Sequence, residues 1–181
     1  MDKKVLIDIA KEAIESKFNK KTIDKERLIK ENPELAKEGA VFVTLKQHGH
    51  LRGCIGSLIA HRPLIDDLIH NAQSSAFSDP RFSPLKESEL KDTDIEISLL
   101  SPYKEVEYKD IDELKKKIRP NIDGVILKLG SYQATFLPQV WEELPTFELF
   151  FAHLCQKAGL NSSCLENHPN IYTYQVEKIE Q

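Results

Sequence analysis

The stretch Leu51-Arg52-Gly53-Cys54-Ile55-Gly56 decides the predicted fold. We expect it to be the second strand of an antiparallel β-hairpin. Val41–Leu45 is rich in β-branched and aromatic residues, which favour strands. His48-Gly49 suits a two-residue hairpin loop, since glycine adopts positive φ freely and histidine tolerates it well. The chain is therefore expected to return antiparallel through residues 51–57, with this hairpin inside a sheet.

The hexapeptide combines residue types that are unusual for a purely structural strand. Side chains alternate along a regular strand, so Arg52 and Cys54 are expected on one face and Gly53 on the other. Glycine weakens a strand, and Gly53 and Gly56 therefore indicate a bulge or a close approach to the backbone. We expect Cys54 to line a concave site, at least in part.

The rest of the chain predicts an α+β fold, a mainly antiparallel β-sheet built from hairpins with helices packed around it. No linker or repeat interrupts it, so a single domain over residues 1–181 is expected. Apolar spacing predicts helices near 6–18, 25–38 (interrupted at Pro33), 64–76, 111–118 and 147–158. One more helical turn is expected over 84–90, and Thr146 is expected to be the N-cap of the last helix. Alternation predicts strands over 94–100, 124–129, 132–137 and a closing strand over 171–178.

Composition argues against several function classes. The formal net charge is −4 and the sequence pI is about 5.9, which disfavours nucleic acid as a partner. No apolar stretch is long enough to span a bilayer, and the N-terminus does not resemble a signal peptide, so no membrane association is expected. Three cysteines without paired spacing predict a reducing compartment and a cytoplasmic protein.

Cys54 is the leading catalytic candidate, with Arg52 as its companion. A thiolate is a strong nucleophile, and a guanidinium beside a thiol favours the thiolate. Backbone N–H groups around Gly53 and Gly56 can approach an oxyanion or a carboxylate, because no Cβ blocks the way. Two alternatives stay open: Cys54 lines a binding pocket without covalent chemistry, or it packs as a small apolar residue.

Arg52 requires a partner if it is buried, and Asp79 and Glu96 are the acidic residues expected to pair with it. An unpaired Arg52 would instead indicate an anionic ligand. Arg81, in the sequence Asp79-Pro80-Arg81-Phe82, is a second cation that can serve either purpose.

Gln139 follows a predicted strand, and its amide either lines the same cleft as Cys54 or ties down the turn. His48 and His50 with Cys54 have a spacing that would suit a metal only in a regular strand, and the turn should separate them, so no metal is expected. Of the other cysteines, Cys155 is expected to be buried and Cys164 to be partly exposed and incidental. The chain contains no phosphate-binding loop, catalytic triad or dinucleotide fingerprint, and no cofactor is predicted.

The hexapeptide resembles the signature of the AMMECR family. Further segments fit that family in order: Asn71-Ala72 to Ala76-Phe77, Asp79–Phe82 with Pro84-Leu85, Ile95–Ser98 with Leu100–Pro102, Leu137–Val140, Leu154-Cys155 and Lys157–Leu160. The resemblance implies a fold and a candidate site around residues 51–56. It also implies a modification pathway shared with Memo-type and radical-SAM proteins, acting on an unidentified small molecule or protein.

Two hypotheses of different classes follow. In the first, the protein is an enzyme, or a component of an enzyme system, that uses the cleft around Cys54 and Arg52. In the second, it is a non-catalytic binding or adaptor domain in which the hexapeptide is a structural or ligand-holding strand, since no general base is identifiable near Cys54.

Overall fold

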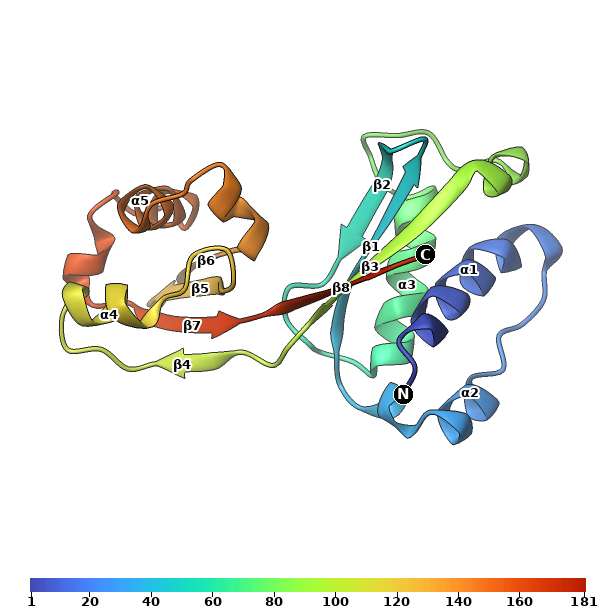
Figure 1. Ribbon diagram of the computed structural model, residues 1–181, viewed down its shortest axis with the longest axis horizontal. Coiled ribbons are helices and arrows are strands. Elements are labelled where there is room, and N and C mark those ends of the chain that lie inside the picture. The colour runs from blue at the N-terminus through green and yellow to red at the C-terminus, as the bar shows by residue number, and fades with distance from the viewer. The chain divides into compact units, whose positions relative to one another are not determined.

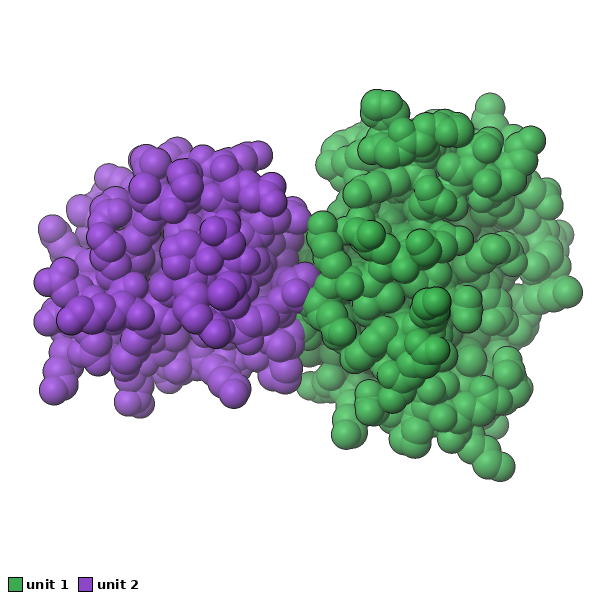
Figure 2. Space-filling model, in the orientation of Figure 1, with its two compact units in different colours: residues 1–100, 177–181 green, residues 101–176 purple.

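The computed structural model describes every residue from Met1 to Gln181 and confirms the α+β class. Its strands form two four-stranded sheets, with orders β2-β1-β3-β8 and β4-β7-β5-β6. The residues group into two compact units, 1–100 with 177–181 and 101–176 (Figures 1 and 2). Each unit has its own apolar core. The single domain over residues 1–181 stays a prediction.

Unit 1 contains the hairpin and the helices that cover one face of its sheet (Figure 1). Val43 and Leu45 point into a core shared with the long helices α1 and α3. The bounds of its elements are α1 Lys4–Asn19, α2 Lys25–Glu31, η1 Pro33–Ala36, β1 Ala40–Gln47, β2 His50–Gly56, α3 Leu64–Phe77, η2 Glu87–Asp92, β3 Thr93–Leu100 and β8 Val176–Glu180.

Unit 2 contains the second sheet and two α-helices, of which α5 is the longer. Its elements are β4 Lys104–Val106, α4 Ile111–Lys117, β5 Gly124–Leu129, β6 Tyr132–Phe136, η3 Pro138–Glu142, α5 Phe147–Lys157, η4 Cys164–Asn167 and β7 Asn170–Tyr174. Trp141 stacks on Phe150 in its core, and the indole N–H donates to the Asp123 carbonyl oxygen at 2.8 Å. Thr146 caps α5 as its sequence predicts, accepting from the Leu149 N–H.

Three expectations about these elements are corrected. The closing strand is two strands, β7 and β8, which belong to different sheets. The hairpin is not internal, because its second strand, β2, is an edge strand of the sheet. Cys155 and Cys164 form a disulfide that joins α5 to η4, and Cys164 is buried rather than incidental. The two cysteines are nine positions apart in the sequence, and the turn after α5 brings them together. This spacing is not one that predicts a disulfide.

The hairpin turn has the predicted conformation, since His48 and Gly49 have φ of 51° and 80°. The pairing of β2 with β1 is regular from Gly56 to Gly53 and then shifts: Gly53 lies opposite Leu45, whereas Leu51 lies opposite Lys46. Arg52 is therefore the extra residue of a β-bulge. The bulge breaks the regular alternation on which the shared face of Arg52 and Cys54 was predicted.

Gly53 is buried because helix α3 crosses it. A Cβ at this position would collide with the backbone carbonyl oxygen of Ser75. The absence of a side chain therefore lets β2 and α3 pack in direct contact.

We predict that Gly53→Ala lowers the free energy of unfolding by about 1–3 kcal/mol, the usual cost of overpacking a close contact. Urea denaturation of the variant measures this loss. Ser75→Ala is the matched control: it leaves the carbonyl oxygen in place, so the double variant should be no more stable than Gly53→Ala. A Gly53→Ala protein as stable as the parent would show that α3 moves aside without cost.

Candidate functional site

The Cys54 side chain lies on the face of the sheet away from α3. Its strand neighbour Gly53 faces α3, and alternation turns Cys54 to the opposite face together with its cross-strand partner Thr44. Sγ of Cys54 and Oγ1 of Thr44 are 3.2 Å apart and share a hydrogen bond. Cys54 is half-buried, and it is the free cysteine of the chain. The site therefore presents one reduced thiol beside a hydroxyl group.

The backbone of Cys54 is held on its outer side by the turn after α3. The Ser57 N–H donates to the Val41 carbonyl, so the backbone groups of Ser57 point toward β1. Along an antiparallel pair, the residues whose backbone groups point toward the partner strand alternate with residues whose groups point away from it. Cys54 is three positions before Ser57, so its N–H and C=O point away from β1. The Asp79 carboxylate accepts that N–H at 3.0 Å, and Nη2 of Arg81 donates to the C=O at 3.4 Å. The two side chains supply the hydrogen bonds that another strand would supply.

Asp79 and Arg81 also bind each other. Nε of Arg81 donates to Oδ1 of Asp79 at 3.1 Å and Nη2 donates to Oδ2 at 2.8 Å. Asp79 is buried, and the Arg81 guanidinium, followed by the backbone N–H groups of Cys54 and Arg81, holds the pKa of its carboxyl far below the usual range against the effect of burial. Asp79 is thus a permanent anion at neutral pH.

The Arg81 side chain is 55% exposed, so its far side faces solvent. Its hydrogen bonds to Asp79 raise the pKa of its guanidinium. Arg81 is therefore the cation that contacts Cys54, through the backbone carbonyl, whereas the sequence placed Arg52 beside the thiol.

Arg52 pairs with Glu89, and the predicted pairing with Asp79 or Glu96 is wrong. Nε of Arg52 donates to Oε2 of Glu89 at 3.1 Å and Nη2 to Oε1 at 3.3 Å. Asp79 is already bound by Arg81, and Glu96 lies on β3, two strands away from β2. The Arg52 and Arg81 guanidinium carbons lie 5.9 and 5.5 Å from the centre of the Phe82 ring, so the ring contacts both cations.

Glu89 is a residue of this site that the sequence reasoning missed. The pKa of its carboxyl is lowered to about 2, first by the hydrogen bonds from Arg52 and then by those from Gln47 and the Lys86 N–H. The only signal in the sequence is its place in the helical turn predicted over 84–90, and that turn is η2. The bulge at Arg52 is what directs the guanidinium to η2.

Glu96 is buried within the sheet and binds two lysines. Lys46 and Lys178 lie 2.9 and 3.1 Å from its two carboxylate oxygens. Their hydrogen bonds lower the pKa of Glu96 although burial opposes them. The triad ties β8 to the sheet through side chains, and Glu96 is not a ligand of Arg52.

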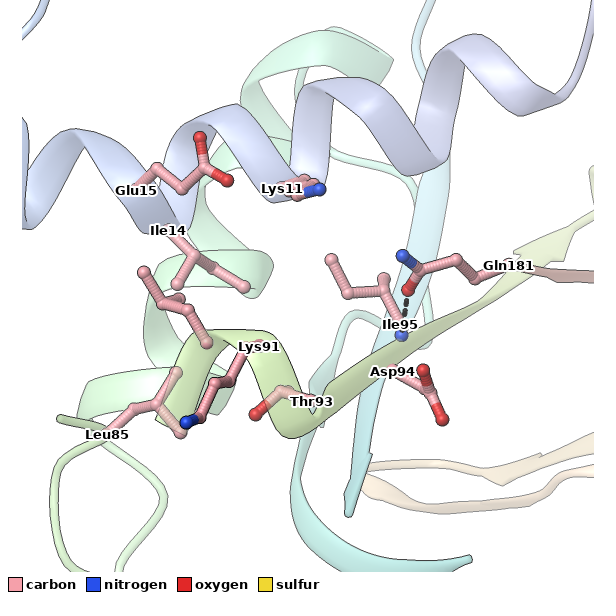
Figure 3. Close-up of a pocket in the computed structure, with 10 residues that line it drawn as sticks. Lys11, Ile14, Glu15, Leu85, Lys91, Thr93, Asp94, Ile95 and Gln181 are labelled. Carbon is pink, nitrogen blue, oxygen red and sulfur yellow. Dashed lines mark hydrogen bonds between the residues drawn. The ribbon is translucent and has the colours of Figure 1, made fainter. Parts of the chain in front are cut away.

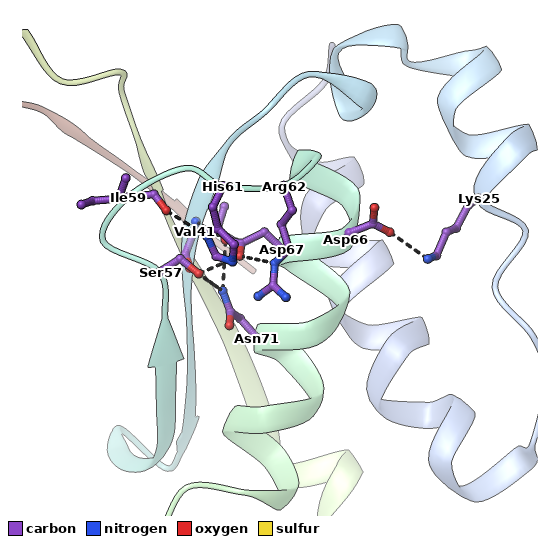
Figure 4. Close-up of polar contacts among 9 residues, drawn as sticks. All are labelled: Lys25, Val41, Ser57, Ile59, His61, Arg62, Asp66, Asp67 and Asn71. Atoms are coloured by element: carbon purple, nitrogen blue, oxygen red, sulfur yellow. Dashed lines mark hydrogen bonds and ion pairs between the residues drawn. The ribbon is translucent and has the colours of Figure 1, made fainter.

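The segment that leaves β2 is anchored by a buried polar cluster around Asp67 of α3 (Figure 4). The Asp67 carboxylate accepts from Ser57 Oγ at 2.6 Å, from Arg62 Nε at 2.8 Å and from the Val41 N–H at 2.9 Å. Asn71 adds a bond to the Val41 carbonyl at 3.0 Å. Both ends of the Cys54 strand are therefore fixed, one by Asp67 and the other by the hairpin turn.

Gln139 and the hairpin histidines stand apart from these contacts. Gln139 is exposed in η3 of unit 2, and its side chain makes no hydrogen bond, so the structure gives it no role in tying down the turn. Its predicted role in lining the Cys54 cleft stays a prediction. His48 and His50 are exposed in and beside the turn. Gly56 packs against Phe42 and has no room for a Cβ.

Comparison with known proteins identifies the family. The AMMECR1 family model matches residues 7–179. The chain belongs to the AMMECR1 family. A protein of Methanothermobacter thermautotrophicus is 38% identical over 178 residues, which cover 96% of this chain and 91% of that protein. A protein of Thermococcus onnurineus is 39% identical over 160 residues, covering 82% of this chain and 76% of the relative.

A solved structure has the same fold. The crystal structure of uncharacterized protein PH0010 from Pyrococcus horikoshii aligns with a TM-score of 0.79 at 35% identity, covering 98% of this chain and 90% of that chain. In the present AMMECR1 chain, none of the helices combines the length and apolar character needed to cross a bilayer.

The pair of Arg52 and Glu89 makes stability depend on pH. The folded pKa of Glu89, about 2, is below its ordinary value of 4.5, so its contribution is complete above pH 4.5 and is lost as the pH falls toward 2. We predict that Glu89→Gln is less stable than the parent by about 1–2 kcal/mol at pH 7, as for a partly exposed charged hydrogen bond.

Thermal melts between pH 7 and pH 2 measure the difference between parent and variant, which should shrink toward zero in acid. Glu87→Gln, an exposed glutamate of the same short helix, is the control and should have no effect at any pH. A difference that persists unchanged at pH 2 would rule out the Glu89 charge as its source.

Proposed function

We propose that this AMMECR1 protein is a component of a modification pathway in which the Cys54 thiol is the reacting group. The observation that carries the proposal is one half-buried free thiol on an anchored strand, 3.2 Å from a hydroxyl group. Arg81, which Asp79 holds, donates to the backbone carbonyl of the same cysteine. A thiolate fixed near a guanidinium is the arrangement that reactive cysteines use.

The chemistry that this arrangement supports is nucleophilic attack. Sγ of the thiolate forms a bond to an electrophilic carbon of the substrate, and the leaving group departs with the electron pair of the bond that breaks. The proton of the thiol passes to solvent. Arg81, with more than half of its side chain exposed, is placed to bind an anionic group of the substrate as well.

Memo-type and radical-SAM proteins are the partners that we propose for this pathway, and the substrate is a small molecule or a protein. The support is the resemblance in sequence, which joins the three kinds of protein in one system. A pathway of this kind would use the AMMECR1 domain to present its thiol to the product or substrate of a partner.

A second candidate function is a non-catalytic binding or adaptor domain. This function is favoured because residues of the hexapeptide already make contacts within the protein and are not free to bind a substrate. Arg52 pairs with Glu89, and α3 packs on Gly53. Neither a histidine nor a carboxylate bonds the Cys54 thiol, so the chain supplies no general base in direct contact. In this function the hexapeptide is a structural strand.

Alkylation of the native protein separates the two functions. We predict that iodoacetamide labels Cys54 at pH 7 without unfolding, and that Arg81→Gln slows labelling several-fold because the thiolate loses its cation. Arg27→Gln, which removes an exposed arginine of α2, is the control and should leave the rate unchanged. Cys54→Ser supplies the blank, since Cys155 and Cys164 are joined in a disulfide.

Labelling that occurs only after denaturation would contradict the proposal and leave the adaptor function. Equal rates for the parent and Arg81→Gln would show that the guanidinium does not act on the thiol.

A further inference from the structure

We propose that a cavity between α1, η2 and the start of β3 binds an α-amino acid with an apolar side chain (Figure 3). This site lies wholly in unit 1, shares no residue with the contacts of Cys54, and goes beyond the function proposed above.

The size and lining of the cavity set the apolar part of the ligand. Its volume is about 140 Å³, and Ile14, Leu90 and Ile95 form apolar walls. A cavity of about 150 Å³ is large enough to hold benzene. One six-membered ring or one branched aliphatic side chain is therefore the size that fits.

The rim of the cavity sets the polar part of the ligand. Lys11 and Glu15 project from α1, Lys91 from η2, and Asp94 from β3 (Figure 3). Among the residues drawn, the bond from the Ile95 N–H to Gln181 is the one hydrogen bond, so these four charges do not neutralise one another by direct contact. None of the four takes part in a salt bridge elsewhere in the protein.

The balance of these charges selects the headgroup. Two ammonium and two carboxylate groups sum to zero, so the rim attracts neither a simple anion nor a simple cation over a long range. A zwitterionic headgroup places its carboxylate against a lysine and its ammonium against Glu15 or Asp94, and thereby uses both signs of charge. An apolar side chain with such a headgroup is an α-amino acid.

Titration of the ¹⁵N-labelled full chain with phenylalanine tests the site. We expect saturable shifts at the amides of Ile14, Leu90 and Ile95. Three probes each lack one part of phenylalanine. Glycine lacks the aromatic side chain, phenylacetate lacks the ammonium group, and phenethylamine lacks the carboxylate. Each should bind about tenfold more weakly than phenylalanine, a factor that corresponds to roughly 1.4 kcal/mol.

Charge reversal at the rim is the second arm, because exposed side chains change there without disturbing the core. Lys11→Glu should weaken phenylalanine binding about tenfold, the equivalent of one lost charged hydrogen bond. Lys37→Glu is the matched control, an exposed lysine outside the cavity, and it should bind like the parent.

Three results would overturn the proposal. The first is that phenylalanine gives no saturable shift, and the second is that phenethylamine or phenylacetate binds as tightly as phenylalanine. The third is that the Lys11→Glu variant binds phenylalanine as tightly as the Lys37→Glu variant does. None of them bears on Cys54, so the failure of this site is distinguishable from the failure of the proposed function.

Discussion

The hydrogen bond from the Cys54 N–H to the Asp79 carboxylate is the interaction on which the candidate site depends. An edge strand presents unpaired backbone groups on its outer side, and β2 is such a strand. Asp79 and Arg81 occupy those groups at Cys54, which closes the edge where the thiol lies. The same turn places Arg81 on the backbone carbonyl of Cys54, so one turn determines both the position of the strand and the cation that contacts it.

Two further constraints act on the same strand from other directions. Helix α3 packs directly on Gly53, and Glu89 binds the guanidinium of the bulged Arg52. Together with Asp79 they fix three consecutive residues through a backbone contact, an ion pair and a backbone hydrogen bond. The backbone that carries the thiol is thereby held in place, and such preorganisation is what a nucleophile or a precise binding contact requires.

The sequence predicted the local structure well and the tertiary partners poorly. The hairpin turn at His48-Gly49, the cap at Thr146 and the stripe of α3 follow from residues close in the chain, and all are confirmed. The partner of Arg52 depends on a one-residue bulge, which alternation cannot reveal, and the disulfide of Cys155 depends on how the chain turns after α5. The division of 171–178 between two sheets likewise follows from long-range pairing. The functional roles predicted for Cys54, Gly53 and Arg81 were inferred from the chemistry of these residues, and they stay predictions.

Amide hydrogen exchange at Cys54 tests the central claim most directly, because alternation turns the N–H groups of Cys54 and Gly56 to the same outer edge of β2. The account predicts that the Cys54 amide is protected like that of Val43 in the ladder, while the Gly56 amide exchanges faster. In Asp79→Ala, the Cys54 amide should exchange as fast as that of Gly56, with Val43 unchanged. Equal, rapid exchange of Cys54 and Gly56 in the parent protein would contradict it.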